Sequence, residues 1–162
     1  MTQGTDSNIP FLRHTVAALA YRGGKALRGA PPEFAGFKVG PATRTPGQIL
    51  AHLSDLLDWA LSFVSADPGW RPVAPTTWDQ DVERFFAALK ALDKRLASGK
   101  PLGVPAEKLF QGPIADAFTH VGQLAMLRRL AGSPVRGENY FKAEIVAGRV
   151  GPKQAAPGFE FD

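Results

Sequence analysis

The chain has 162 residues, of which 44% are hydrophobic and 21% charged, and it carries a net charge of +4 at neutral pH. These values are typical of a single domain that buries its own core, and they exclude a wholly disordered chain. Cysteine is absent, which excludes a disulfide scaffold, a thiolate metal site and a cysteine nucleophile.

The sequence also indicates where the protein is located and which macromolecules it does not bind. No apolar stretch reaches the ~20 residues that a membrane-spanning helix needs, and the N-terminus has neither the basic nor the apolar region of a signal peptide. We therefore expect a cytoplasmic protein that does not bind membranes. The excess of basic residues lies near the two ends without forming a dense stripe, which argues against nucleic acid as a partner.

Apolar residues recur at helical spacing and predict four long helices. The first is expected over residues 9–27. The loop over residues 29–44 is rich in Gly and Pro, and it either packs on the core through its phenylalanines or serves as a lid; we favour packing. The second helix has a clear start, because Thr45 is a suitable N-cap, Pro46 fits the first helical position and Gln48 completes a capping box.

The third helix is expected to begin after Thr76 or Thr77, and the fourth is expected over residues 113–130, preceded by a short helical turn. Together the four helices predict an all-α fold, a single four-helix-bundle domain over residues 1–162 with long loops. Its core spans about residues 8–132.

Residues 133–162 form an irregular C-terminal tail that packs on or flanks the bundle. Within this tail a short helix is expected over residues 139–146. Phe159 and Phe161 either dock the end of the chain or stay loose.

Three histidines offer candidates for a functional site. His14 has no acidic residue or histidine one turn away and is expected on the surface. His52 lies at the edge of the leucine face of the second helix. His120 follows Asp116 by four residues, which places both side chains on one helix face with Cβ atoms about 5–6 Å apart. This spacing suits either a surface hydrogen bond or two ligands of one metal ion.

Expected burial of Asp116 favours the metal alternative. The fourth helix is apolar on nearly all sides, so Asp116 should be partly buried, where a carboxylate needs a cation or a hydrogen-bond network. His52 would supply a third ligand from a neighbouring helix, as is common in the cores of helical bundles. The sequence therefore predicts that His52, Asp116 and His120 hold one divalent metal ion.

Two polar residues stand three positions after the histidines: Asp55 after His52, and Gln123 after His120. Asp55 could orient the His52 ring, and Gln123 could contact a substrate or a metal-bound water. We favour solvent-facing positions for both. Arg128 and Arg129 are expected to interact with the dipole at the end of their own helix.

The motifs around the three predicted ligands resemble the DinB-like family, also called the DinB/YfiT-like metalloenzymes. They read Thr45-Pro-Gly-Gln-Ile-Leu-Ala-His52 and Asp116-Ala-Phe-Thr-His120-Val-Gly-Gln. The resemblance implies a four-helix bundle in which His52 and His120 match two of three metal ligands. Asp116 stands where the family usually has a histidine. The implied metal is nickel or zinc, and the ligand set of two histidines and a carboxylate also suits iron or manganese.

The resemblance further implies a metal-dependent enzyme of small-molecule metabolism or detoxification, either an S-transferase that joins a low-molecular-weight thiol to an electrophile or an isomerase that acts through a thiol adduct. Because the chain has no cysteine, the nucleophile must be such an external thiol or a metal-activated water, and the water predicts a hydrolase. A non-catalytic, stress-associated metal-binding bundle is the alternative from another class. We expect a small-molecule substrate and, by analogy, a homodimer.

Overall fold

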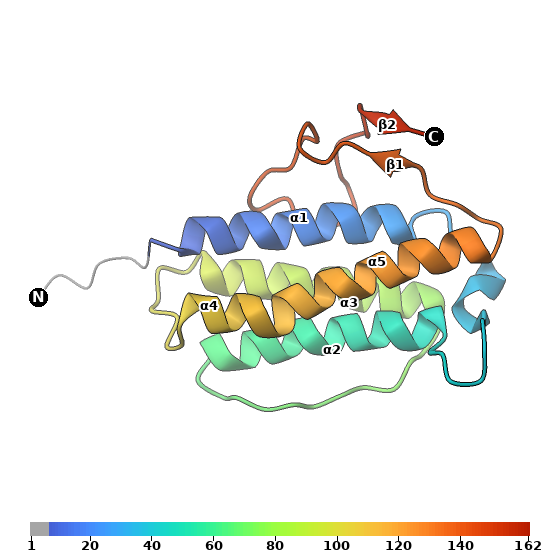
Figure 1. Ribbon diagram of the computed structural model, residues 1–162. Coiled ribbons are helices and arrows are strands. Elements are labelled where there is room, and N and C mark those ends of the chain that lie inside the picture. The colour runs from blue at the N-terminus through green and yellow to red at the C-terminus, as the bar shows by residue number, and fades with distance from the viewer. Residues whose placement is uncertain (1–6) are drawn as a thin grey trace, which may run out of the picture.

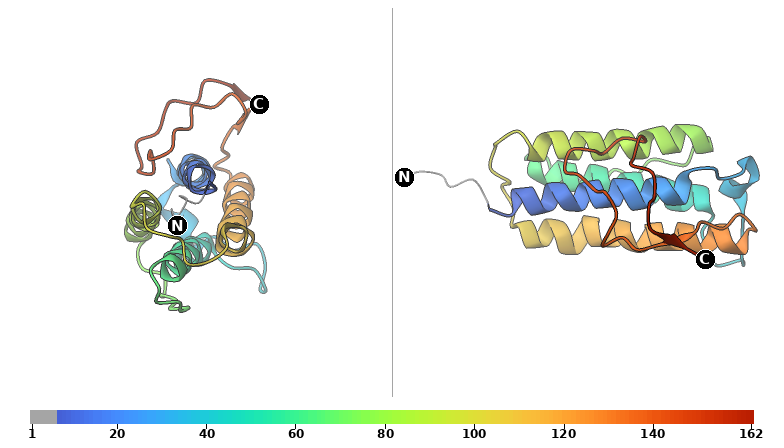
Figure 2. Two further views of the ribbon diagram at one scale, coloured as in Figure 1. Left: turned by 90° about the vertical axis from the view of Figure 1, so that its left-hand side faces the viewer. Right: turned by 90° about the horizontal axis from the view of Figure 1, so that it is seen from above.

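Four long helices lie side by side in the computed structural model, which describes residues 7–162 (Figure 1). They are α1 (Ile9–Leu27), α2 (Pro46–Val64), α3 (Trp78–Leu96) and α5 (Ala115–Leu130). Helices α1 and α2 each contact both α3 and α5, so that the end view shows the four at the corners of a square (Figure 2). The predicted all-α helical bundle is confirmed.

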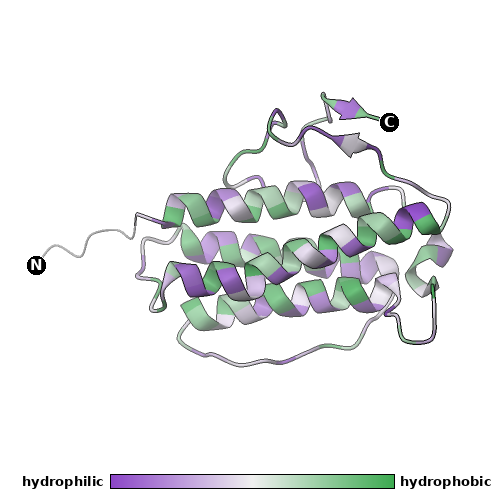
Figure 3. Ribbon diagram, in the orientation of Figure 1, coloured by the Kyte–Doolittle hydropathy of each residue, from purple (hydrophilic) through white to green (hydrophobic). Residues whose placement is uncertain are grey.

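The helix boundaries follow from local chemistry. Thr45 and Gln48 form the expected capping box at the start of α2, each side chain bonding the other residue's backbone N–H. Thr77 caps α3 by accepting a hydrogen bond from the Gln80 N–H. Hydrophilic residues lie among the hydrophobic ones along every long helix (Figure 3), and the apolar side chains facing inward make one continuous core.

Helices α2 and α3 run in the same direction, so the chain between them must return along the length of the bundle (Figure 1). Residues 65–77, called here the connector, make this return in irregular conformation along α2. Helix α2 has 19 residues and is therefore about 28 Å long, a distance that a 13-residue extended segment spans easily. The connector matters because it passes the predicted metal ligands.

The last long helix begins earlier than residue 113. Helix α4 (Ala106–Leu109) leads without a break into a π-helical turn, η2 (Phe110–Ile114), and then into α5. Pro113 lies inside η2, where the wider turn accommodates a residue that has no N–H to donate. No helix in residues 7–162 is long and apolar enough to cross a membrane.

The loop between α1 and α2 packs on the bundle as expected. Its 3-10 helix, η1 (Pro32–Gly36), buries Phe34 against Trp78, with ring centroids 5.4 Å apart in an edge-to-face contact. The remainder of the loop returns to α2 and ends beside the predicted metal ligands, as described below.

The sequence predicts that Arg128 interacts with the end of its own helix, but the structure shows that it also contacts the end of α1. Its side chain is buried and donates hydrogen bonds to the backbone carbonyls of Ala26, Arg28 and Gly29, as well as to Ser133. These are carbonyls at the end of α1, which lack partners within that helix. Burial lowers the pKa of Arg128. The residue therefore joins the ends of α1 and α5.

The C-terminal tail lies on the outer face of α1 (Figure 2). The expected helix over residues 139–146 is absent: a turn and a bend occupy residues 140–143, and residues 144–146 have no regular structure. Instead, two short antiparallel strands, β1 (Gly137–Glu138) and β2 (Glu160–Phe161), bring the two ends of the tail together. Phe159 and Phe161 remain about half exposed, so apolar burial of these rings does not dock the chain end.

Polar contacts hold the tail in place. Glu138 is buried, and it accepts hydrogen bonds from the Tyr21 hydroxyl and from the Lys25 ammonium group, the latter at 2.8 Å. Lys25 also donates to Glu160 at 2.9 Å. Burial disfavours the Lys25 ammonium, but the hydrogen bonds to the two glutamates outweigh this and raise its pKa. The guanidinium of Arg22 lies over the Tyr140 ring, 4.2 Å from its centroid.

These contacts predict an acid-sensitive tail. The hydrogen bond from Lys25 lowers the pKa of Glu160 below its ordinary value of 4.5, so its stabilising effect is complete above pH 4.5 and is lost as the pH falls through the lowered value. We expect Glu160→Gln to lower the melting temperature at pH 7 and to lower it less as the pH is reduced from 4.5 toward 3, because protonation of Glu160 in the parent removes the same charge. An equal loss at pH 7 and pH 3, in thermal unfolding followed by circular dichroism, would contradict this linkage.

Candidate metal centre

Three side chains that are distant in sequence meet between α2 and α5. His52 lies on the second turn of α2, whereas Asp116 and His120 lie one turn apart on α5. Each offers one ligand atom, and the three atoms lie within 4.8 Å of one another. The structure therefore brings together the three residues that the sequence singles out, and they form a group that could bind a metal ion. His14, by contrast, is exposed on α1, as expected.

The distances suit a small divalent ion. The Nε2 atom of His120 lies 3.4 Å from Oδ1 of Asp116, and Nε2 of His52 lies 3.8 Å from Oδ2 of the same carboxylate. Ligands bound at about 2.0–2.1 Å around a tetrahedral ion lie about 3.3 Å apart. The three ligand atoms, which lie within 4.8 Å of one another, would have to move closer together for all three residues to bind one ion.

Gln123 orients the His120 ring. Its Oε1 atom lies 2.8 Å from Nδ1 of His120, and because an amide oxygen only accepts, Nδ1 carries the proton. The lone pair of the neutral ring is then on Nε2, the nitrogen that faces Asp116. Gln123 is exposed, as expected, but it also supplies the kind of contact that fixes the tautomer of metal-binding histidines.

Aromatic rings orient His52. The ring contacts Trp70 of the connector edge to face at 5.6 Å between centroids and the His120 ring at 4.7 Å. Burial lowers the pKa of His52, and the neighbouring His120 and Arg44 lower it further, outweighing the opposite effect of Asp116 and Asp55. His52 is therefore neutral at pH 7, which is the form that binds metal ions.

The expected burial of Asp116 is wrong. Its side chain is 48% exposed, compared with 21% for His52 and 12% for His120. Helix α5 packs mainly against α1 and α2 among the long helices, and it leaves a face that includes Asp116 and Gln123 open to solvent. An exposed carboxylate needs no partner cation. The proximity of the two histidines, and not burial, is therefore the argument for a metal ion.

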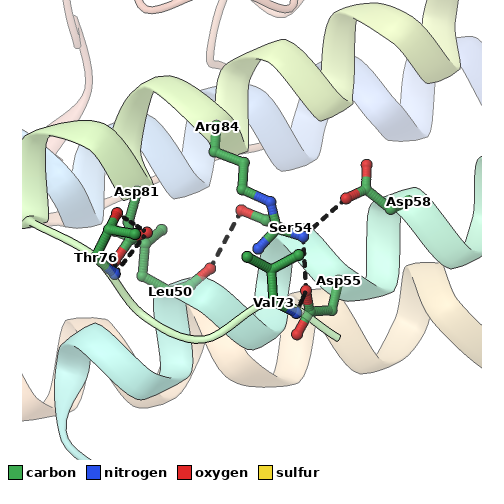
Figure 4. A network of polar contacts seen from close by, with 8 residues as sticks. All are labelled: Leu50, Ser54, Asp55, Asp58, Val73, Thr76, Asp81 and Arg84. Atoms are coloured by element: carbon green, nitrogen blue, oxygen red, sulfur yellow. Dashed lines mark hydrogen bonds and ion pairs between the residues drawn. The ribbon is translucent and has the colours of Figure 1, made fainter. Parts of the chain in front are cut away.

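Asp55 neither contacts His52 nor faces solvent, contrary to both alternatives for this residue. It is buried, and its Oδ1 atom accepts hydrogen bonds from the Arg84 guanidinium at 2.6 Å and from the Val73 backbone N–H at 3.1 Å (Figure 4). Arg84 also reaches the more exposed Asp58 at 2.8 Å. The contact with Val73 attaches the connector to α2, three residues from Trp70.

This arrangement predicts that removing the Asp55 carboxylate costs much more stability than removing that of the neighbouring Asp58. Asp55→Ala should lower the free energy of unfolding by about 2–3 kcal/mol, because it leaves Arg84 and the Val73 N–H partly unpaired in a buried position. Asp58→Ala, the control, should cost less than about 1 kcal/mol, because its carboxylate is half exposed. Urea unfolding followed by tryptophan fluorescence measures both, and equal costs would contradict the assigned role.

Two cavities flank His52. The larger, of about 530 Å³, lies toward α5 and is lined by the following residues: Thr43, Arg44, Ile49, His52, His120, Gln123, Met126 and Leu127. The smaller, of about 310 Å³, lies toward the connector and includes Trp70 and Val73. Arg44 and His52 line both.

Sequence reasoning missed Arg44 and Trp70. Both belong to irregular segments, where no helical spacing relates them to His52. No motif in the sequence marks either residue.

Comparison with protein-family models, curated proteins and solved structures gave no match to this chain. The functional interpretation therefore rests on the residues and geometry of the centre.

Proposed function

We propose that the chain is a divalent-metal-dependent enzyme, related to the DinB-like family, that transfers a low-molecular-weight thiol to a small electrophilic substrate. The observation that carries the proposal is the convergence of His52, Asp116 and His120 from two helices, with ligand atoms within 4.8 Å. Nickel or zinc suits two imidazoles and one carboxylate, as do iron and manganese. When bound, such an ion makes a coordinated thiol or water a stronger nucleophile at neutral pH.

The residues around the centre have distinct tasks in this proposal. Three protein ligands leave coordination positions open, as in catalytic metal sites. Gln123 holds the His120 ring with Nε2 toward the centre, and Trp70 packs against the His52 ring. Together these contacts keep both imidazoles oriented before a substrate arrives, which reduces the reorganisation that binding requires.

The two cavities favour group transfer over hydrolysis. A transferase must hold two organic molecules beside the reacting centre, whereas a hydrolase needs one such molecule and a water. His52 separates a cavity of about 530 Å³ from one of about 310 Å³, which gives each of two ligands its own space. The absence of cysteine from the chain requires the thiol to come from solution.

The proposal is tested by measuring whether turnover of an electrophile requires both a small thiol and the bound metal. Protein loaded with nickel or zinc should consume a model electrophile such as 1-chloro-2,4-dinitrobenzene faster than the uncatalysed reaction in the presence of glutathione, cysteine or another small thiol. Chelator-treated protein should not. Hydrolysis of a model ester without any thiol would favour the hydrolase. A protein that binds the metal without turnover of either substrate would favour the non-catalytic bundle.

A further inference from the structure

One cation beside the metal centre has no partner in the described part of the chain. Arg44 precedes the first turn of α2, and its side chain is exposed where the two cavities meet. It makes no hydrogen bond or ion pair with any residue between 7 and 162. It nevertheless lies close enough to His52 to lower the pKa of that residue.

The charges around the larger cavity favour an anionic ligand. Among the described residues, those lining it that can titrate are Arg44, His52 and His120, and none of them is a carboxylate. Asp116, the acidic residue of the centre, would be offset by the charge of a bound divalent ion. The carboxylate of Asp55 is already paired with Arg84. Arg44 would then give this cavity an unbalanced positive charge.

The ligand should carry one negative charge rather than several. In the part of the chain that the structure describes, Arg44 is the only arginine or lysine that lines the larger cavity. Phosphate sites generally combine several cations or free N–H groups at a helix start. At the start of α2, the capping box already uses the N–H groups of Thr45 and Gln48. A planar guanidinium pairs well with a single carboxylate.

The rest of the larger cavity is apolar. Ile49, Met126 and Leu127 line it, and the Met126 side chain is 61% exposed to solvent. An apolar body that covers Met126 would gain hydrophobic stabilisation while its carboxylate contacts Arg44.

From these observations we infer that Arg44 binds the carboxylate of a small monoanionic substrate whose apolar body occupies the cavity between Arg44, Met126 and the two histidines. This inference rests on the proposed function, because it takes the metal centre as the place where that substrate reacts. It assigns Arg44 the role of a specificity-determining residue that holds one end of the substrate while the other end reaches the centre.

Calorimetric titration with phenylacetate and its neutral analogue phenylacetamide tests the inference. The proteins are the parent, Arg44→Gln and Lys90→Gln, each in metal-loaded and chelator-treated form. Lys90 is an exposed residue of α3 outside both cavities, so its variant removes one positive charge as a control. The chelator-treated form separates binding by Arg44 from coordination of the carboxylate to the metal.

The parent and Lys90→Gln should bind phenylacetate more tightly than phenylacetamide, with and without metal. Arg44→Gln should bind phenylacetate about tenfold or more weakly and lose this preference, because it loses a charge-assisted hydrogen bond. Its metal stoichiometry should equal that of the parent.

Three outcomes would overturn the inference: equal binding of the two probes by the parent, equal losses in Arg44→Gln and Lys90→Gln, or no binding of phenylacetate up to about 10 mM. A preference for phenylacetate that requires metal and survives Arg44→Gln would assign the carboxylate to the ion instead, and would also overturn it. Failure of the proposed function gives a different result. In that case the parent protein binds no metal but can still bind phenylacetate through Arg44.

Discussion

His120→Ala is expected to weaken the binding of nickel or zinc by at least about a hundredfold, because it removes one of three protein ligands. His52→Ala should have a similar effect, although it changes a different helix. Since Nε2 of each histidine lies within 4 Å of a carboxylate oxygen of Asp116, the two losses should be far from additive when both variants are combined. Titration with the metal, followed by elemental analysis after gel filtration, measures the affinity and the stoichiometry.

Two controls make this prediction specific. His14→Ala removes an exposed histidine of α1 that lies outside the centre, and its metal affinity should equal that of the parent. Gln123→Leu keeps all three ligands but removes the acceptor for Nδ1 of His120, and it should weaken the affinity by about 10- to 100-fold. If His120→Ala and His14→Ala bind the metal alike, the three residues do not form a metal centre.

Glu138→Ala is expected to lower the free energy of unfolding by about 3–5 kcal/mol, because it removes a buried carboxylate that accepts hydrogen bonds from both Tyr21 and Lys25. Lys25 retains Glu160 as a partner, but the Tyr21 hydroxyl loses the acceptor that the structure gives it. The variant should also expose the C-terminal tail to proteases, since Glu138 belongs to the short strand that pairs with the chain end.

Glu144→Ala is the matched control, because Glu144 is an exposed residue of the same tail whose ion pair with Arg149 lies at the surface. Its loss should cost less than about 1 kcal/mol. The combined variant Lys25→Met/Glu138→Leu should recover part of the stability that Glu138→Ala loses, since it no longer buries the Lys25 ammonium with only one of its two carboxylate partners. Urea unfolding and limited trypsinolysis measure these effects, and equal losses for Glu138→Ala and Glu144→Ala would contradict the role of the buried network.

Much of the secondary structure could be predicted from local signals. The helix expected over residues 9–27 has the boundaries of α1, and the capping box at Thr45 begins α2. Capping and helical spacing act between residues at most four positions apart, so the sequence displays them directly. The pairing of Asp116 with His120 is a local signal of the same kind, and it marked two of the three residues of the candidate centre.

The errors concern side chains whose partners are far away in the chain. Asp55 lies three residues after His52, yet Arg84 and Val73 bind it. The sequence places Arg128 at its own helix end, yet it also reaches carbonyls at the end of α1. Helical spacing gives the face on which a side chain lies but not the neighbour that covers that face, and for this reason Asp116 was expected to be buried.

By itself, the sequence determined the helical elements, the absence of any thiol from the chain and the three residues of the candidate metal centre. Only the tertiary structure decided that His52 faces Asp116 and His120, that the connector brings Trp70 onto the His52 ring, and that Arg44 stands between two cavities without an ion pair to any described residue. The physical reason is that helix formation depends on neighbours within one turn, whereas these contacts depend on how whole helices and irregular segments pack against one another.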